Sequence, residues 1–180
     1  MHQSLPLTAH ASDLRICELS LLQQVLLVTD GTLTTLLELY TGESIHVVKL
    51  AEVLRSADQE QGLLNLAEDQ PVMARTVVLQ GRTSQRNWLY AESLIVPERL
   101  DPHFQARLLH SHEPIGKLWL EQRVETFKEQ VAAYRQPANG LGRYFGLEAG
   151  DELLCRTYLV FSQRQPVMLI AEKFPVSYFV

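Results

Sequence analysis

Residues 73–97 read Met73-Ala-Arg-Thr-Val-Val-Leu-Gln-Gly-Arg-Thr-Ser-Gln-Arg-Asn-Trp-Leu-Tyr-Ala-Glu-Ser-Leu-Ile-Val-Pro97, and residues 153–175 read Leu153-Leu-Cys-Arg-Thr-Tyr-Leu-Val-Phe-Ser-Gln-Arg-Gln-Pro-Val-Met-Leu-Ile-Ala-Glu-Lys-Phe-Pro175. In each stretch, two segments rich in β-branched and aromatic residues flank a polar turn, which is typical of a β-hairpin. The two stretches also resemble each other, with Arg-Thr in the outgoing segment, Ala-Glu in the returning one and a closing proline. They predict one antiparallel sheet built from two similar hairpins.

The segments outside the hairpins supply helices and further strands. The other expected elements are a first helix from Ser12 or Asp13, a helix over residues 32–40 that ends at Gly42, a strand over residues 44–55 and a helix over residues 101–111. Residues 117–135 favour a helix by local propensity, but Phe127, Glu129, Val131 and Ala133 alternate as in a strand, so both alternatives stay open. Helices and strands in separate runs predict an α+β fold with helices packed on the sheet.

Length and composition fit one globular domain over residues 1–180. Sixteen Lys and Arg against 21 Asp and Glu give a net charge of −5, which offers no general attraction to nucleic acids or to anionic membranes. The opening residues resemble no signal peptide, and no apolar run approaches the roughly 20 residues that span a bilayer. We therefore expect a cytoplasmic protein, favoured to be a monomer, with Cys17 and Cys155 as two buried, reduced thiols.

Common catalytic and metal-binding motifs are absent from the sequence. It contains no phosphate-binding glycine loop, dinucleotide fingerprint, metalloprotease helix or kinase signature. His110 and His112 have a chelating spacing and His103 is near, but no acidic or cysteine partner completes a zinc pattern, so we interpret them as exposed histidines. No serine stands in a nucleophile elbow. These motifs therefore give no indication of a metal or a cofactor.

Four ionisable residues interrupt the apolar hairpin strands: Arg75, Glu92, Arg156 and Glu172. Side chains alternate in direction along a strand, so one alternative is a solvated sheet face with ion pairs across the strands. The other alternative is a small pocket between sheet and helices, in which a guanidinium binds a ligand carboxylate through two hydrogen bonds and a buried carboxylate has a perturbed pKa. Spacing alone does not choose between them.

The same stretches resemble the chorismate pyruvate-lyase family, and most closely its cyanobacterial and actinobacterial-type branch. The blocks that carry the resemblance are Thr29-Asp-Gly-Thr-Leu-Thr-Thr-Leu-Leu-Glu38, Arg75-Thr-Val-Val-Leu-Gln-Gly81, Trp88 to Pro97, Pro114-Ile-Gly-Lys117, and Arg156-Thr-Tyr to Pro175. Each block is short, but they follow the family order and span most of the chain.

The resemblance implies a fold, a reaction and a ligand. The fold is a six-stranded antiparallel sheet with helices packed on it around a pocket, which makes part of residues 124–134 a strand. The reaction converts chorismate to 4-hydroxybenzoate and pyruvate without metal or organic cofactor, and 4-hydroxybenzoate is a head-group precursor for plastoquinone- or ubiquinone-type quinones. The implied partners are this substrate and product, with no nucleic acid and no membrane insertion.

The resemblance also implies roles for individual residues. Arg75 matches the arginine that holds the ring carboxylate, and Glu172 matches the glutamate that contacts the ring hydroxyl. Ile115 stands in the turn where a backbone amide meets the ligand carboxylate, at a position where leucine is usual. Leu33 matches an apolar position that lines the pocket. Arg75 and Glu172 are therefore the expected catalytic residues.

Two further residues and one segment are less closely matched. Arg156 is a candidate contact for the pyruvyl carboxylate, and Glu92 is expected to be structural. The connection over residues 137–150 is longer than in compact members of the family. The segment Leu147-Glu-Ala-Gly-Asp-Glu-Leu-Leu154, followed by the final hairpin, also resembles the effector-binding domains of GntR-type transcription regulators. Because only 28 residues precede the Thr29 block, too few for a winged helix, the alternative function is a stand-alone small-molecule-binding domain without catalysis.

Overall fold

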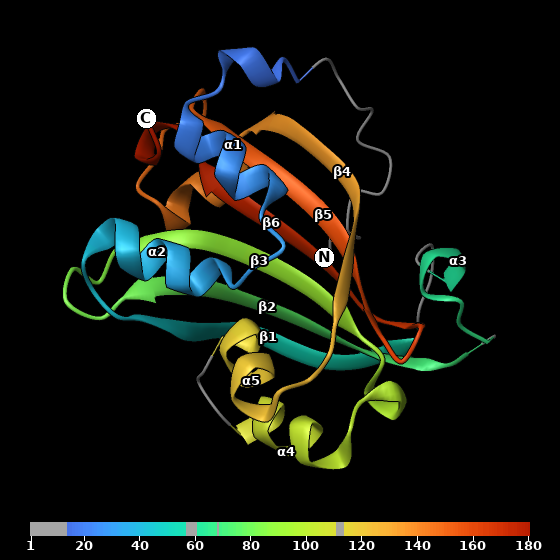
Figure 1. Cartoon of the computed structure of the whole chain (residues 1–180). Helices are drawn as coiled ribbons and strands as arrows, with labels where there is room; N and C mark the ends of the chain where they lie inside the picture. The colour runs from blue at the N-terminus through green and yellow to red at the C-terminus, as the bar shows by residue number, and fades with distance from the viewer. Residues whose placement is uncertain (1–13, 57–60, 68, 111–113) are drawn as a thin grey trace.

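A six-stranded antiparallel sheet forms the framework of the protein in the computed structural model (Figure 1). The structure describes residues 14–56, 61–67, 69–110 and 114–180. The strands lie in the order β1-β2-β3-β6-β5-β4. Their bounds are β1 Ile45–Ser56, β2 Pro71–Gly81, β3 Asn87–Ile95, β4 Phe127–Pro137, β5 Glu152–Ser162 and β6 Gln165–Pro175. The predicted α+β class with an antiparallel sheet of about six strands is confirmed.

Both predicted hairpins are present, and their returning strands join them in the middle of the sheet. β3 pairs with β6, where Ala91 lies opposite Glu172. The β5–β6 turn consists of Gln163 and Arg164, whose φ angles are 51° and 65°. Positive φ at both central residues gives a two-residue turn the twist that matches its flanking strands. The similar hairpins therefore form the four inner strands, and β1 and β4 are the edges.

Helices cover one face of this sheet and smaller elements cover the other. The helices are α1 Leu21–Val28, α2 Leu33–Thr41, α3 Gln61–Leu64, α4 Pro102–His110 and α5 Ile115–Gln122, and the 3₁₀ turns are η1 Ile16–Glu18, η2 Pro97–Arg99, η3 Asn139–Tyr144 and η4 Val176–Tyr178. In Figure 1, α1, α2, α4 and α5 lie over the same face. On the opposite face, Leu64 of α3 packs with Val72 and Leu94, and Phe145 packs with Tyr90 and Cys155. The face beneath the four longer helices carries the cavity described below.

The first helix begins later than the sequence predicts. Ser12 and Asp13 lie outside the described residues, and Leu19 is still extended, with φ −87° and ψ 145°. Helix α1 begins at Leu21 because Ser20 and Gln23 form a capping box, in which each side chain bonds to the other's backbone N–H at 3.1 Å. The expectation of a helix from Ser12 or Asp13 is therefore wrong for the described residues before Leu21.

The remaining expected elements are largely confirmed. Helix α2 ends at Gly42, whose φ of 69° is the left-handed conformation that a helix end favours. Strand β1 matches the expected strand over residues 44–55, and α4 matches the helix expected over residues 101–111, of which Ser111 lies outside the described residues. The ambiguous stretch divides into α5 and β4 at Arg123, which has a φ of 52°. Part of residues 124–134 is thus a strand, as the resemblance implies.

One of the two cysteine predictions is wrong. Both thiols are free, but Cys17 is exposed and only Cys155 is buried. Cys17 lies in the 3₁₀ turn η1, which buries none of its residues.

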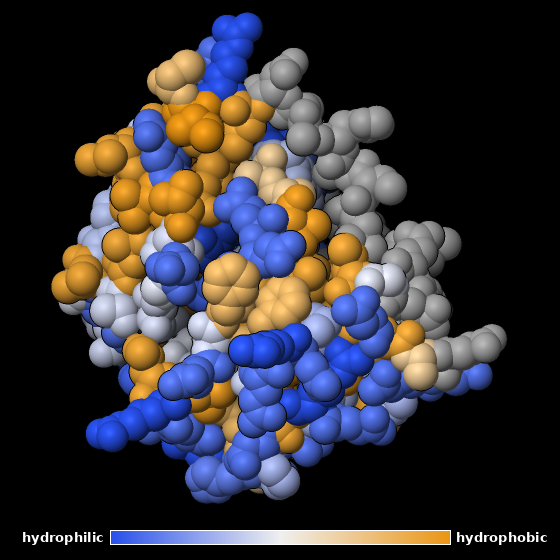
Figure 2. All heavy atoms as spheres, turned by 45° about the vertical axis from the view of Figure 1, so that its right-hand side comes forward, coloured by the Kyte–Doolittle hydropathy of each residue, from blue (hydrophilic) through white to orange (hydrophobic). Residues whose placement is uncertain are grey.

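No helix among the described residues is long and apolar enough to cross a membrane. Large apolar side chains do remain exposed on the outer sides of α1 and α2, including Leu21, Val28 and Leu39, and apolar residues gather in the upper part of the face in Figure 2.

Candidate active site

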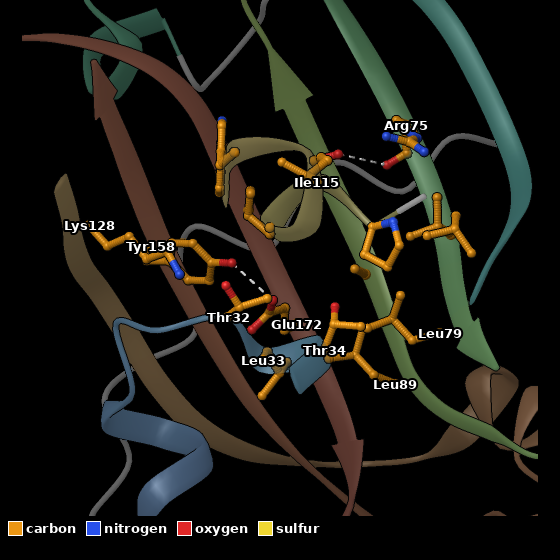
Figure 3. A pocket seen from close by; sticks show the side chains of 18 residues that line it. Thr32, Leu33, Thr34, Arg75, Leu79, Leu89, Ile115, Lys128, Tyr158 and Glu172 are labelled. Atoms are coloured by element: carbon orange, nitrogen blue, oxygen red, sulfur yellow. Dashed lines mark hydrogen bonds between the residues drawn. The ribbon is translucent and has the colours of Figure 1, made fainter. Parts of the chain in front are cut away.

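A cavity lies between the helix-covered face of the sheet and the N-terminal ends of α2 and α5 (Figure 3). The space between its lining residues is about 650 Å³, a value that includes space open to solvent. Its walls are mostly aliphatic. The polar or charged side chains that line it are Thr32, Thr34, Arg75, Ser93, Lys128, Tyr158 and Glu172. The cavity therefore combines an apolar enclosure with a few groups that can orient a charged ligand.

Arg75 provides a buried positive charge from β2. Its residue exposure is only 2%, and its Nε has no hydrogen-bond partner among the described residues. The Glu52 carboxylate oxygen nearest to Nε lies 3.6 Å away, on the neighbouring edge strand. Burial lowers the pKa of the Arg75 guanidinium, and Glu52 opposes that effect; an arginine nevertheless stays charged in proteins. A buried guanidinium with an unused N–H is suited to bind an anion.

Glu172, on β6, is held by two donors from β5. Arg156 Nε donates to Glu172 Oε2 at 2.6 Å, and the Tyr158 hydroxyl donates to Oε1 at 2.9 Å. Arg156 lies directly opposite Glu172 in the β5–β6 register, and its Nη1 also donates to the Thr29 carbonyl at 2.9 Å. Burial, reinforced by the charge of Glu172, raises the pKa of Tyr158 well above its usual value, so that its hydroxyl stays a donor. The carboxylate therefore has a fixed position at the cavity wall.

Lys128 brings a second positive charge to the cavity, from edge strand β4. Its Nζ donates to the Gly31 carbonyl at 3.0 Å and lies 5.5 Å from the centroid of the Tyr158 ring. Burial lowers the pKa of the Lys128 ammonium, and Arg156 lowers it further, whereas Glu172 and Asp30 act in the opposite direction. Figure 3 shows Lys128 beside Tyr158, on the opposite side of the cavity from Arg75.

Two helix N-termini complete the cavity. α2 follows Thr32 and α5 follows Pro114, and neither helix has a side chain that caps its first N–H groups. The first N–H groups of a helix have no partner within the helix and carry a partial positive charge. The two helix ends meet closely, because a Cβ added at Gly116 would lie 3.1 Å from Thr32 Cγ2. Backbone donors are therefore available on the helix side of the cavity, facing the charged groups of the sheet.

Comparison with known proteins assigns this pocket-forming fold to a family. The family model described as "Chorismate pyruvate-lyase Rv2949c-like" matches residues 27–179. The chain belongs to this family. The resemblance seen in the sequence is thereby confirmed.

Curated relatives and a solved structure agree with that assignment. A chorismate pyruvate-lyase of Mycobacterium tuberculosis (strain CDC 1551 / Oshkosh) is 27% identical over 175 residues, which cover 93% of this chain and 86% of that protein. One of Mycobacterium leprae is 31% identical over 159 residues, covering 87% and 75%. The effector domain of PhnF from Mycobacterium smegmatis superposes with a TM-score of 0.64 at 14% identity, covering 83% of this chain and 91% of that one. That last likeness shows the fold alone.

Four of the five predicted site residues line the one cavity described above: Leu33, Arg75, Ile115 and Glu172. Their roles toward a ligand stay predictions. The fifth, Arg156, does not line the cavity and instead contacts Glu172.

The alternative of a solvated sheet face is wrong for three of the four ionisable strand residues. Arg75, Arg156 and Glu172 are 2%, 3% and 7% exposed. Glu92 points to the opposite face of the sheet, where its carboxylate pairs with Lys173 Nζ at 2.7 Å and accepts a hydrogen bond from Tyr90. The expectation that Glu92 is structural fits this placement.

Sequence reasoning missed two features of the site. It found no titratable partner beside Glu172, whereas the structure places Arg156 and Tyr158 there. It also overlooked Lys128, although the alternation that begins at Phe127 already placed Lys128 on the other side of the same strand.

Within the described ranges, no group of three or more histidine, cysteine, aspartate or glutamate side chains lies close enough together to hold a metal ion. His112, one of the histidines with a chelating spacing, lies outside the described residues.

The donor that Tyr158 provides to Glu172 makes a prediction about stability. Tyr158→Phe is expected to lower the free energy of unfolding by about 1.5–3 kcal/mol, because a hydrogen bond to a buried charged group is lost. Urea denaturation measures the loss. The matched control is Tyr134→Phe, since the buried Tyr134 hydroxyl has no hydrogen-bond partner among the described residues. A change of under about 1 kcal/mol is expected there, and equal losses in both variants would contradict the assigned role of Tyr158.

Proposed function

We propose that this protein is a chorismate lyase that converts chorismate to 4-hydroxybenzoate and pyruvate. The observation that carries the proposal is that a buried Arg75 and a fixed Glu172 carboxylate line the same cavity in a chain of the chorismate pyruvate-lyase family. The named relatives support lyase activity. The product would serve as the aromatic head-group precursor of a plastoquinone- or ubiquinone-type quinone.

The charged groups of the cavity match the polar ends of the ring. In chorismate, the ring carboxylate and the ring hydroxyl stand on opposite carbons. The Arg75 guanidinium can bind the carboxylate through two hydrogen bonds, assisted by the free backbone N–H groups at Ile115. Glu172 can accept a hydrogen bond from the hydroxyl. Leu33, Leu79 and other aliphatic side chains pack against the ring between these ends.

The reaction itself requires little covalent help from the protein. The bond between the ring and the ether oxygen breaks, and the hydrogen on the hydroxyl-bearing carbon leaves, so that the ring becomes aromatic. The ether fragment becomes pyruvate, whose methyl group gains one hydrogen. A protein that holds the dianion in the reactive conformation and limits water access supplies much of what this step needs.

Glu172 acts in this proposal by orienting the ring hydroxyl. Arg156 donates to one of its carboxylate oxygens and Tyr158 to the other, and each oxygen keeps a further lone pair that can accept from the ring hydroxyl. Arg156 also compensates the charge of the carboxylate. In this proposal the ring hydrogen passes within the substrate, from the ring carbon to the methylene carbon of the ether fragment, and Glu172 removes no proton.

The decisive experiment is a cofactor-free assay. Purified protein incubated with chorismate, without added metal, is expected to release 4-hydroxybenzoate and pyruvate in equal amounts. Release no faster than the spontaneous background, over a range of pH and salt, would reject the enzyme. It would favour the alternative, a stand-alone binding domain, which is suggested by the fold that the chain shares with a regulator's effector domain.

Replacement of Arg75 tests the carboxylate contact. Arg75→Lys is expected to weaken 4-hydroxybenzoate binding by about 1.5–3 kcal/mol, because an ammonium group cannot replace a planar guanidinium that makes two hydrogen bonds. Isothermal titration of the folded variant measures the change. Arg82→Lys, in the exposed β2–β3 turn, is the matched control. Unchanged affinity in Arg75→Lys would remove Arg75 from the ligand site.

Replacement of Glu172 separates orientation from base catalysis. Glu172→Gln is expected to weaken 4-hydroxybenzoate binding and to lower kcat by less than about tenfold, whereas loss of a general base lowers it roughly 10²–10⁴-fold. The wild-type reaction in D₂O gives a second measure. Transfer within the substrate leaves the pyruvate methyl group free of deuterium, while a base route through solvent introduces one deuteron. A large kcat loss with deuterated pyruvate would make Glu172 the base.

A further inference from the structure

The second cation of the cavity, Lys128, has no role in the ring contacts described so far. It lies next to Tyr158, and hence on the Glu172 side of the cavity, while Arg75 lies on the other side (Figure 3). Burial of a cation is costly unless a negative group compensates it. Lys128 is half-buried, its only direct hydrogen bond among the described residues is to the uncharged Gly31 carbonyl, and the carboxylates that act on its charge, Glu172 and Asp30, do not accept a hydrogen bond from it. An ammonium has three N–H donors, so further donors remain for a ligand.

The chemistry of the proposed substrate places a second negative charge on the same side. Chorismate carries its second carboxylate on the ether side chain, and the ether is attached to the ring carbon next to the hydroxyl-bearing one. When the ring carboxylate binds Arg75 and the hydroxyl faces Glu172, the ether side chain must leave the ring near Glu172. The second carboxylate therefore lies toward the Lys128 side of the cavity and away from Arg75.

Arg156, the residue first considered for this carboxylate, is already engaged. Its Nε donates to Glu172 and its Nη1 donates to the Thr29 carbonyl. Its Nη2 is buried without a partner, but the residue does not line the cavity. Lys128 does line the cavity, and its side chain is supported by the α1–α2 connection at Gly31.

We propose that Lys128 binds the carboxylate of the ether side chain and thereby makes the site selective for dicarboxylates over monocarboxylates. This inference rests on the proposed function for the identity of the ligand. Arg75 recognises the charge that substrate and product share, and Lys128 recognises the charge that only the substrate carries. 4-Hydroxybenzoate lacks the Lys128 contact, so cleavage of the ether removes one of the two charged contacts that hold the ligand.

Binding of two stable aromatic acids tests the inference without turnover. 4-Hydroxybenzoate has one carboxylate, and 3-(carboxymethoxy)-4-hydroxybenzoate carries a second one on an ether at the same ring position as in chorismate. Lys128→Met is expected to weaken binding of the dicarboxylate by about 10- to 100-fold, the range of a hydrogen bond to a charged group. Its affinity for 4-hydroxybenzoate is expected to stay within about threefold of wild type, because Arg75 and Glu172 are untouched. Isothermal titration measures both affinities.

Control variants separate the charge of Lys128 from its structural role. Arg135→Met removes another β4 cation, which pairs with Glu152 and does not line the cavity, so both affinities should be kept. Lys128→Arg should keep most of the dicarboxylate preference. If Lys128→Met does not fold, Lys128→Gln retains a donor for the Gly31 carbonyl without the charge and should show the same selective loss. Equal weakening of both acids, or no change for either, would overturn the inference.

The outcome is independent of the assay for lyase activity. A protein that releases no pyruvate but loses only dicarboxylate affinity in Lys128→Met would retain the two-anion site while the proposed reaction fails. If the protein cleaves chorismate but Lys128→Met binds the dicarboxylate as tightly as wild type, the proposed role of Lys128 is rejected while the proposed reaction stands.

Discussion

The ion pair between Arg156 and Glu172 is the interaction on which the site depends. It crosses two inner strands, β5 and β6, and its partners are 3% and 7% exposed. Breaking a buried pair is costly, because the remaining charge stays uncompensated. Arg156 extends the same network to the Thr29 carbonyl, so the connection between α1 and α2 is fixed relative to the carboxylate. A single guanidinium thus positions both the acidic wall of the cavity and part of its cover.

The two similar hairpins use the same residue types for different purposes. Arg75 lies opposite Ser93, whereas Arg156 lies opposite Glu172. Glu92 is therefore one residue out of register with Arg75, and one residue along a strand reverses the direction of a side chain. The carboxylate of the first hairpin points to the opposite face and pairs with Lys173 there. Arg75 consequently has no carboxylate opposite it on β3, and the carboxylate opposite it on β1, Glu52, lies 3.6 Å from Nε without a hydrogen bond to that atom.

The charged side chains on the two faces of the sheet differ in how fully the protein itself pairs them. The pairs on the opposite face, such as Glu92 with Lys173, compensate one another within the sheet. On the cavity face, Arg156 compensates Glu172, but Arg75 Nε has no hydrogen-bond partner among the described residues, and the half-buried Lys128 ammonium contacts an uncharged carbonyl. A buried donor without a partner, such as Arg75 Nε, reduces stability, so a fold that keeps it is suited to a ligand that completes it. The likeness to regulator effector domains shows that the same fold occurs in proteins of another kind, and the function is decided by the groups that line the cavity.

The sequence by itself determined the local elements. β-Branched segments around polar turns identified both hairpins, and Gly42 identified the end of α2. The polar interruptions in apolar strands nominated Arg75, Glu92, Arg156 and Glu172, from which the family resemblance selected Arg75 and Glu172. These features depend on neighbours along the chain, so composition and periodicity reveal them. The sequence also contained the signal for the late start of α1, because Ser20 and Gln23 have the spacing of a capping box.

Only the tertiary structure decided which face each charged side chain occupies. Residues 127–137 form β4 against their helical propensity, because they pair with β5 along their whole length. That pairing carries Lys128 to the cavity, and the β5–β6 register places Arg156 beside Glu172 and not in the cavity wall. Strand register and sheet order join residues that are far apart in the chain, and a shift of one residue exchanges buried and exposed positions. Local sequence patterns do not contain that information.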